Sequence, residues 1–228
     1  MGTLSSQALS IVRDASSMTD YSLQALSILR DPAQFKWYII SVLLVVLFIY
    51  TKEAATRNWS AVLAGLAFWG MDWFNEIWNA LVLYFSQYAP VWCAPGGGTS
   101  YLILVGLNIE ITFMFLIMGL MSTLLLPEDT RMKIMGINNR IVIAAFMSVL
   151  CVAVEVVLNL AGVLTWEYAW WSITAPWLIW LIGYMPFWLV AFWVHDMVNT
   201  RRQVMTTGVI LAFDVICLVV FGGILGWI

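Results

Sequence analysis

The chain has 228 residues, of which 63% are hydrophobic and 10% are charged, and it contains 14 tryptophans. Soluble domains carry about 25% charged residues, so this composition excludes an ordinary soluble protein and predicts a polytopic membrane protein. The net charge of −3 comes without any basic cluster, which argues against nucleic-acid binding. The three cysteines are far apart in the sequence and form no metal-site or disulfide pattern. We therefore expect neither a metal nor a cofactor.

The N-terminal residues 1–34 contain an internal repeat. The stretch "QALSIVRD" at 7–14 returns as "QALSILRD" at 24–31. In both copies the apolar residues fall at helical spacing, with Ser, Gln and Arg between them. We expect two short amphipathic helices on the membrane surface, with Pro32 ending the second helix. A segment that docks a partner is the alternative interpretation.

Residues 35–228 are expected to form an all-α bundle of about six transmembrane helices. A helix needs about 20 apolar residues to cross a bilayer. Suitable segments lie at 37–50, 59–84, 101–126, 141–164, 176–194 and 207–227. The loops 52–57 and 131–140 and the pair Arg201 and Arg202 carry seven of the ten basic residues. If the spans alternate, the positive-inside rule places these basic loops in the cytoplasm and both termini outside.

The two long outer loops differ in character. The Pro- and Gly-rich stretch "APVWCAPGGGTS" at 89–100 predicts an irregular loop that re-enters the membrane. The stretch "TWEYAWWS" at 165–172 is typical of an aromatic belt at the membrane interface. The rim of a pocket is the alternative interpretation of its three tryptophans.

Polar side chains follow one face of the second predicted span. In "GMDWFNEIWNALV" at 70–82, the residues Asp72, Asn75, Glu76 and Asn79 recur at spacings that place them on one helix face. Burying a carboxyl in hydrocarbon is costly unless the group is paired or neutral. The fourth predicted span has its own polar face, formed by Ser148, Cys151, Glu155 and Asn159.

Carboxyl groups on three spans are expected at one level of the bilayer. With a rise of about 1.5 Å per residue, Glu76, Glu110 and Glu155 all lie on the outer side of their span midpoints. Glu110 is turned away from the polar face of Asn108 and Thr112, which leaves open whether it converges with the other two. No Lys, Arg or His lies at this level, so at least one carboxyl is expected to be protonated at pH 7.

Aromatic residues surround the same level. They are Trp69, Trp73, Trp78, Trp177, Trp180, Tyr184 and Trp188. Aromatic faces attract cations, and a neutral carboxyl can donate a proton to a substrate. In the fifth span, Pro186 frees a backbone carbonyl, a common way to open a cavity between helices.

The combination predicts a dry site that stabilises positive charge. The candidate catalytic residues are Asp72, Glu76, Glu110 and Glu155. The candidate substrate-binding residues are Asn75, Trp78, Asn79, Asn159, Trp180, Tyr184 and Trp188. The plainer interpretation is that the polar side chains only bond helix to helix, at about 0.6 kcal/mol each. That interpretation explains the amides better than it explains several acids.

The order of features between 37 and 198 resembles the emopamil-binding, or EXPERA, family of membrane sterol isomerases. In "GMDWFNE", Asp72 stands where that family has a His, and Glu76 matches its Glu. The stretch "NIEIT" supplies Glu110, and "YMPFW" supplies Trp188. The missing His, the sixth span and the N-terminal segment depart from the family. The layout is also similar to the integral-membrane terpene cyclases of fungal pathways. Both resemblances imply protonation of a double bond and stabilisation of a carbocation.

Three functions remain open from the sequence. The first is an isomerase or cyclase acting on a sterol-like or terpene-like lipid, in which Glu76 or Glu110 protonates an alkene and Asn79 and Asn159 position a polar head group. The second is a cation or proton channel or transporter with the acids as a relay. The third is a non-catalytic lipid-binding or assembly subunit of a membrane complex. The expected partners are a hydrophobic substrate and membrane lipids, and homo-oligomerisation is left open.

Overall fold

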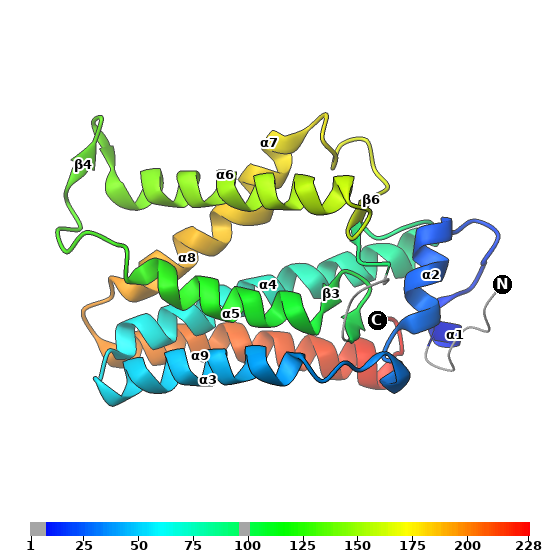
Figure 1. Ribbon diagram of the computed structural model, residues 1–228, viewed down its shortest axis with the longest axis horizontal. Coiled ribbons are helices and arrows are strands. Elements are labelled where there is room, and N and C mark those ends of the chain that lie inside the picture. Colours follow the sequence, from blue (N-terminus) through cyan, green and yellow to red (C-terminus); the bar gives the residue numbers. More distant parts are fainter. Residues whose placement is uncertain (1–7, 96–100) are drawn as a thin grey trace.

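The structure, a computed structural model, describes residues 8–95 and 101–228. Within these residues, every predicted span contains a helical segment of the bundle (Figure 1). The segments are α3 (Ile39–Ala55), α4 (Trp59–Ser86), α5 (Ile109–Thr123), α6 (Asn139–Leu160), α7 (Pro176–Leu178) with η2 (Ile179–Tyr184) and α8 (Met185–His195), and α9 (Thr200–Cys217) with η3 (Leu218–Ile224).

Three of the described helical segments are long and apolar enough to cross a membrane, judged by length and composition. They are α6, the segment Pro176–His195 and the segment Thr200–Ile224. Helix α5 is apolar but shorter. The chain is therefore a helical membrane protein in which these three segments have the clearest spanning character.

The bundle has two distinct ends (Figure 1). The connections α3–α4, α5–α6 and α8–α9 meet at the basic end, which takes its name from the basic loops that the sequence places there. The helices α1 (Ala8–Ile11) and α2 (Asp20–Ile28) and the C-terminus lie at the opposite end, called here the capped end. The hairpin of β4 (Lys133–Ile134) and β5 (Ile137–Asn138) belongs to the basic end.

Helix α4 is the centre of the bundle, because α5, α8 and α9 all pack against it. Helix α6 packs instead on α8 and η2. The approach of α5 to α4 is close at Gly119, where a Cβ atom would lie 2.6 Å from the Cβ atom of Phe68. A larger residue at this position would push the two helices apart, which explains the glycine.

The third predicted span starts later in the structure than in the prediction. The expected helix begins at 101, but α5 begins at Ile109, after a hairpin of β2 (Leu102–Leu104) and β3 (Leu107–Asn108). The side-chain oxygen of Asn108 accepts a hydrogen bond from the Ile111 backbone N–H at 2.8 Å and so caps the helix. A continuous apolar run does not distinguish a buried hairpin from a helix, which is why periodicity missed this change.

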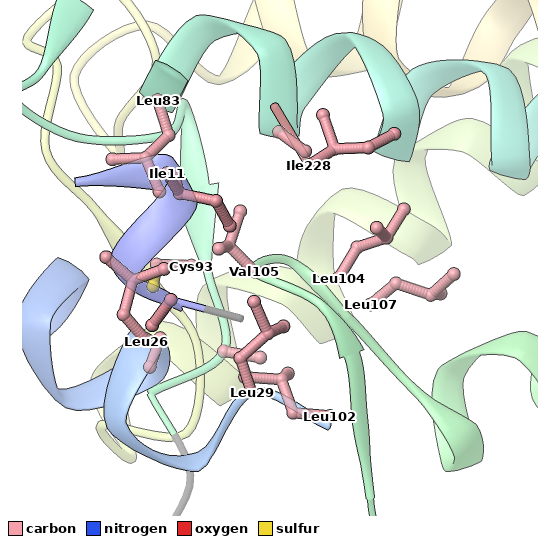
Figure 2. Close-up of a cluster of buried hydrophobic side chains, with 14 of the residues drawn as sticks. Ile11, Leu26, Leu29, Leu83, Cys93, Leu102, Leu104, Val105, Leu107 and Ile228 are labelled. Carbon is pink, nitrogen blue, oxygen red and sulfur yellow. The ribbon is translucent and has the colours of Figure 1, made fainter. Parts of the chain in front are cut away.

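The N-terminal segment packs onto the capped end. A buried apolar cluster joins it to α4 and to the β2–β3 hairpin (Figure 2). Among its members are Ile11, Leu26, Leu29, Leu83, Leu102 and Leu104. The repeated arginines also bond to this end of the bundle, since Arg13 donates to the Tyr84 carbonyl at 2.7 Å and Arg30 donates to the Ile103 carbonyl at 3.0 Å. The apolar faces of both short helices thus contact protein.

An ion pair joins α6 to α8 at the basic end. Arg140 donates to both carboxylate oxygens of Asp196, at 2.8 and 2.9 Å, and His195 Nδ1 lies 3.0 Å from the same carboxylate. Burial raises the pKa of the Asp196 carboxyl, but the hydrogen bonds from Arg140 and His195 lower it by more. The pKa of Asp196 therefore lies below its usual range.

We expect Asp196→Asn to reduce the free energy of unfolding by about 1.5–3 kcal/mol at pH 7, the usual contribution of hydrogen bonds to charged groups. Because the pKa of Asp196 is lowered in the folded state, its stabilisation is complete above the ordinary value of about 3.9. It is lost as the pH falls through the folded value. Denaturant unfolding of the purified protein at pH 7 and at pH 3 measures both, and the exposed Glu128→Gln is the control. Equal losses at the two pH values would contradict the assignment.

Candidate functional site

A cavity of about 210 Å³ lies between α4, α5, α6 and the η2–α8 segment. Its walls are mostly apolar, with side chains such as Ile111, Met118, Met147 and Leu158. Polar side chains gather at one part of the lining, namely Asp72, Asn75, Glu76, Glu155 and Tyr184. We call this site the acidic cavity. Apolar walls with a few convergent polar groups are the usual form of a small-molecule site.

Two carboxyl groups of the acidic cavity are held by neighbouring tryptophans of one β-ribbon. The strands β1 (Trp92–Cys93) and β6 (Thr165–Trp166) pair antiparallel, with Trp92 opposite Trp166. Trp92 Nε1 donates to Glu76 Oε1 at 2.8 Å, and Trp166 Nε1 donates to Glu155 Oε1 at 2.9 Å. The ribbon therefore positions one carboxyl of α4 and one of α6 at the same time.

The remaining polar atoms of the cavity have unused hydrogen-bonding capacity. Four buried atoms of its lining residues have no hydrogen-bond partner among the described residues, namely Asp72 Oδ2, Glu76 Oε2, Trp171 Nε1 and Trp188 Nε1. The lining includes no Lys, Arg or His from the described part of the chain. Buried polar atoms are nearly always paired in native proteins, so these four are available to a bound molecule.

Aromatic rings cover much of the cavity lining. The rings belong to Trp92, Phe115, Trp171, Tyr184, Phe187 and Trp188. Trp92 stacks on Trp171 with a centroid distance of 5.4 Å, and both come from the loops of the capped end. Tyr184 lies beside the Glu155 carboxyl. Rings at this density offer π faces to a positively charged group.

The acidic cavity reaches the side surface of the bundle between α5 and α6. Three of its lining residues are exposed there, Met114 by 41%, Leu150 by 46% and Val154 by 51%. The two helices meet at the sulfur atoms of Met118 and Cys151, which are 3.8 Å apart. These exposed residues border what we call the α5–α6 opening. All three exposed side chains are apolar, so the opening lies on an apolar part of the surface.

Asn79 supports the site from behind without lining it. Its side-chain oxygen accepts hydrogen bonds from the backbone N–H groups of Val91 and Trp92, at 2.6 and 3.2 Å. Its amide nitrogen donates to the Trp92 carbonyl at 2.7 Å. The expected role of Asn79 in binding a head group is therefore corrected, because its hydrogen bonds are committed to the buried loop.

Gly106 lets the β2–β3 hairpin approach this arrangement closely. A Cβ atom at Gly106 would lie 2.5 Å from Asn79 Nδ2, 2.6 Å from Glu76 Oε2 and 2.7 Å from Trp92 Cδ1. Any side chain would displace at least one of these groups.

The other predicted site residues lie outside the cavity lining. Glu110 accepts a hydrogen bond from the Tyr38 hydroxyl, at the first turn of α5. Asn159 donates to the Leu164 carbonyl at 3.0 Å, in the turn after α6, and Trp180 donates to the Ala145 carbonyl at 2.9 Å. Trp78 is partly exposed and its ring contacts Trp92. The sequence left open whether Glu110 converges with Glu76 and Glu155, and in the structure Glu110 contacts Tyr38 before α3 and does not line the cavity. Its expected catalytic role in this cavity is therefore corrected.

Asp214 in α9 is a further buried acid. Neither of its carboxylate oxygens has a hydrogen-bond partner among the described residues. It contacts α4 near Gly70, where a Cβ atom would lie 3.4 Å from Asp214 Oδ2, and it does not line the acidic cavity. The described residues contain no cluster of three or more His, Cys, Asp or Glu side chains arranged to hold a metal ion.

Comparison with known proteins identifies the family. The sequence model of an "uncharacterized membrane protein family" matches residues 19–223. The chain belongs to this family. The predicted resemblance to the EXPERA sterol isomerases and to the terpene cyclases is wrong, because neither the family model nor the relatives show a sign of those families.

Two archaeal relatives are similar to the chain. An "uncharacterized protein" of Archaeoglobus fulgidus is 58% identical over 222 residues, covering 97% of both chains. A second "uncharacterized protein" of the same organism is 58% identical over 53 residues, which is 23% of this chain and 95% of the relative. No solved structure matches the chain.

Several residues that support the site were not evident from the sequence. Sequence reasoning missed Trp92, Gly106 and the methionines of the opening. Trp171 belongs to the stretch 165–172, for which the rim of a pocket was the alternative interpretation, and it lines the cavity. Trp92 had one available signal, since it is an aromatic residue inside the loop predicted to re-enter the membrane. Gly106 also had an available signal, because an isolated glycine inside an apolar run is typical of a point where the backbone comes close to other groups.

Proposed function

We propose that this protein is a membrane-embedded acid–base enzyme that acts on a hydrophobic molecule from the bilayer. One observation carries the proposal: three carboxyl groups, Asp72, Glu76 and Glu155, line one aromatic cavity that opens on an apolar part of the surface between α5 and α6. A water-soluble substrate would have no reason to enter by this route. A passive helix contact would not need several acids around a cavity.

The reaction class that fits these groups is isomerisation or cyclisation of an alkene. A protonated carboxyl gives its proton to one carbon of a double bond, and the other carbon becomes a carbocation. The aromatic faces stabilise that charge. A carboxylate then takes a proton from a neighbouring carbon, which forms a new double bond. One proton is added and one is removed, so the step needs no oxidant, reductant or cofactor.

Glu76 is the proposed proton donor. One of its carboxyl oxygens is fixed by Trp92, which holds the group in one orientation. The other oxygen has no partner in the described residues and is the atom available to a substrate. Asp72 lies one helical turn away on α4, and Glu155 lies on α6, so either is placed to take the second proton.

The proposal includes a topology in which all six helical segments cross the membrane. The basic loops then face the cytoplasm and the capped end faces outside, as the positive-inside rule predicts. The alternation of the helices along the bundle supports this arrangement (Figure 1). The acidic cavity would then lie in the outer half of the bilayer and receive its substrate from the hydrocarbon.

Deuterium incorporation tests the proposed chemistry on a whole lipid extract, so no single substrate has to be chosen beforehand. Membranes containing the protein are incubated in D2O, the lipids are extracted and returned to H2O, and their masses are measured. Alkene protonation places deuterium on carbon, where it survives the return to H2O, unlike deuterium on oxygen or nitrogen. We expect one lipid class to gain stable deuterium only when the protein is present.

Met114→Trp is the matched test of the route. The larger side chain at the α5–α6 opening is expected to reduce incorporation at least tenfold while the carboxyl groups remain in place. The same substitution at exposed Met121, also on α5 but outside the cavity lining, should have little effect. Incorporation that is absent with the wild-type protein, or unchanged in Met114→Trp, would refute the proposal.

A further inference from the structure

The acidic cavity has a size that limits how much of a ligand it can enclose. Its volume is about 210 Å³. An engineered protein cavity of about 150 Å³ is filled by one benzene molecule. The enclosed part of a ligand is therefore about one ring or a few carbon atoms with a polar group. The rest of a longer molecule must pass through the α5–α6 opening into the lipid.

The unpartnered polar atoms of the cavity define the polar group. Asp72 Oδ2 accepts a hydrogen bond as a carboxylate oxygen, whereas the indole nitrogens of Trp171 and Trp188 only donate. The free oxygen of Glu76 is left to the proton transfer proposed above. A ligand group that satisfies both kinds of atom must donate one hydrogen bond and accept another. Buried polar atoms left unpaired cost free energy, so a ligand that pairs both kinds binds best.

The charges of the lining exclude anionic head groups. Three carboxyl groups line the cavity, and the lining contains no Lys, Arg or His from the described residues. A phosphate or carboxylate head would meet acids without a cation to balance it. An ammonium head would donate to the carboxyls but has no lone pair for the Trp188 N–H. A hydroxyl group both donates and accepts.

We infer that the ligand of the acidic cavity is a long-chain lipid alcohol whose neutral hydroxyl group lies between Trp188 and the carboxylate of Asp72, with its chain leaving through the α5–α6 opening. This inference rests on the proposed function, because it takes the cavity to be filled from the bilayer. It adds the class of the head group and its orientation.

Three photoreactive probes test the inference. They share one long alkyl chain with a diazirine near the head and differ only in the head, which is a hydroxyl, an ammonium or a phosphate. The purified protein in detergent is labelled over a range of concentrations, and labelled peptides are identified by mass spectrometry. We expect half-maximal labelling of the cavity-lining parts of α5 and α6 at the lowest concentration for the alcohol, a higher one for the amine, and the highest for the phosphate.

Trp188→Phe gives a sharper test, because it removes the indole N–H and keeps an aromatic ring. We expect alcohol labelling to weaken about 3- to 10-fold, the range for one neutral hydrogen bond. Amine labelling should stay the same, which also shows that the variant is folded. The matched control is Trp193→Phe on the same helix, since Trp193 is 59% exposed and lies outside the cavity lining.

The outcomes separate this inference from the proposed function. Preferred labelling by the phosphate probe, or equal loss of alcohol and amine labelling in Trp188→Phe, would overturn the alcohol assignment and leave a lipid-filled cavity standing. Labelling that is identical in the wild type and in Met114→Trp for every probe would overturn both. Deuterium incorporation into an anionic lipid would support the chemistry and refute the alcohol.

Discussion

Glu76→Gln is expected to slow deuterium incorporation into the substrate lipid by about 10² or more, the usual contribution of a positioned proton donor. Glutamine has the same shape as glutamate and keeps an oxygen that accepts the 2.8 Å hydrogen bond from Trp92 Nε1. The substitution therefore preserves the contact to β1 and removes only the proton that can be transferred. Incorporation rates are measured in membranes matched for protein content.

Folding should be unaffected by this substitution. A neutral amide avoids the free-energy cost of burying a charge away from water. We therefore expect the free energy of unfolding to be unchanged or slightly higher. Glu128→Gln, on the exposed loop after α5, is the matched control and should leave incorporation unchanged. A Glu76→Gln protein that incorporates deuterium at the wild-type rate would exclude Glu76 as the donor and return the role to Asp72 or Glu155.

The helices of the bundle could be predicted well from hydrophobic periodicity. The predicted second span, 59–84, corresponds to α4 at Trp59–Ser86, and the fifth, 176–194, corresponds to the segment Pro176–His195. Such long apolar runs leave the backbone little alternative to a helix in hydrocarbon. The start of α5 could not be predicted in the same way, because the residues of the β2–β3 hairpin are as apolar as those of a helix.

The spacing of the acids on α4 was the most informative part of the site. Asp72, Asn75 and Glu76 share one face of α4 in the prediction and line one cavity in the structure. Helical geometry fixes which residues share a face, so this part follows from the sequence. Which helix that face meets depends on tertiary packing. The spacing of polar residues on α5 could therefore not predict that Glu110 contacts Tyr38, which lies just before α3.

The role of a polar residue was harder to predict than its position. Asn79 continues the polar face of Asp72 and Glu76 by one turn, and nothing in this spacing separates a ligand contact from a backbone contact. The difference arises from the loop after α4, which folds back so that its backbone meets the Asn79 side chain. The sequence indicated a re-entering loop, but it did not indicate which side chain would bond to its backbone.

Asn79→Leu is expected to destabilise the folded protein by about 3 kcal/mol or more. Leucine has a similar volume but leaves two backbone N–H groups and one carbonyl of residues 91 and 92 without partners. Each buried polar group left unpaired costs about 1–3 kcal/mol. Unfolding by increasing SDS in mixed micelles measures the loss of free energy.

The same substitution at Asn75 is the matched control. Asn75 lies one turn earlier on α4, is half-buried and lines the acidic cavity. We expect Asn75→Leu to change the free energy of unfolding by less than about 1 kcal/mol, because replacing a half-exposed amide leaves fewer buried polar groups without a partner. Since β1 carries Trp92, Asn79→Leu should also release the hydrogen bond to Glu76 and reduce deuterium incorporation along with stability. Equal effects of the two substitutions on stability would show that the bonds of Asn79 do not hold the loop, and the site would then need another support for β1.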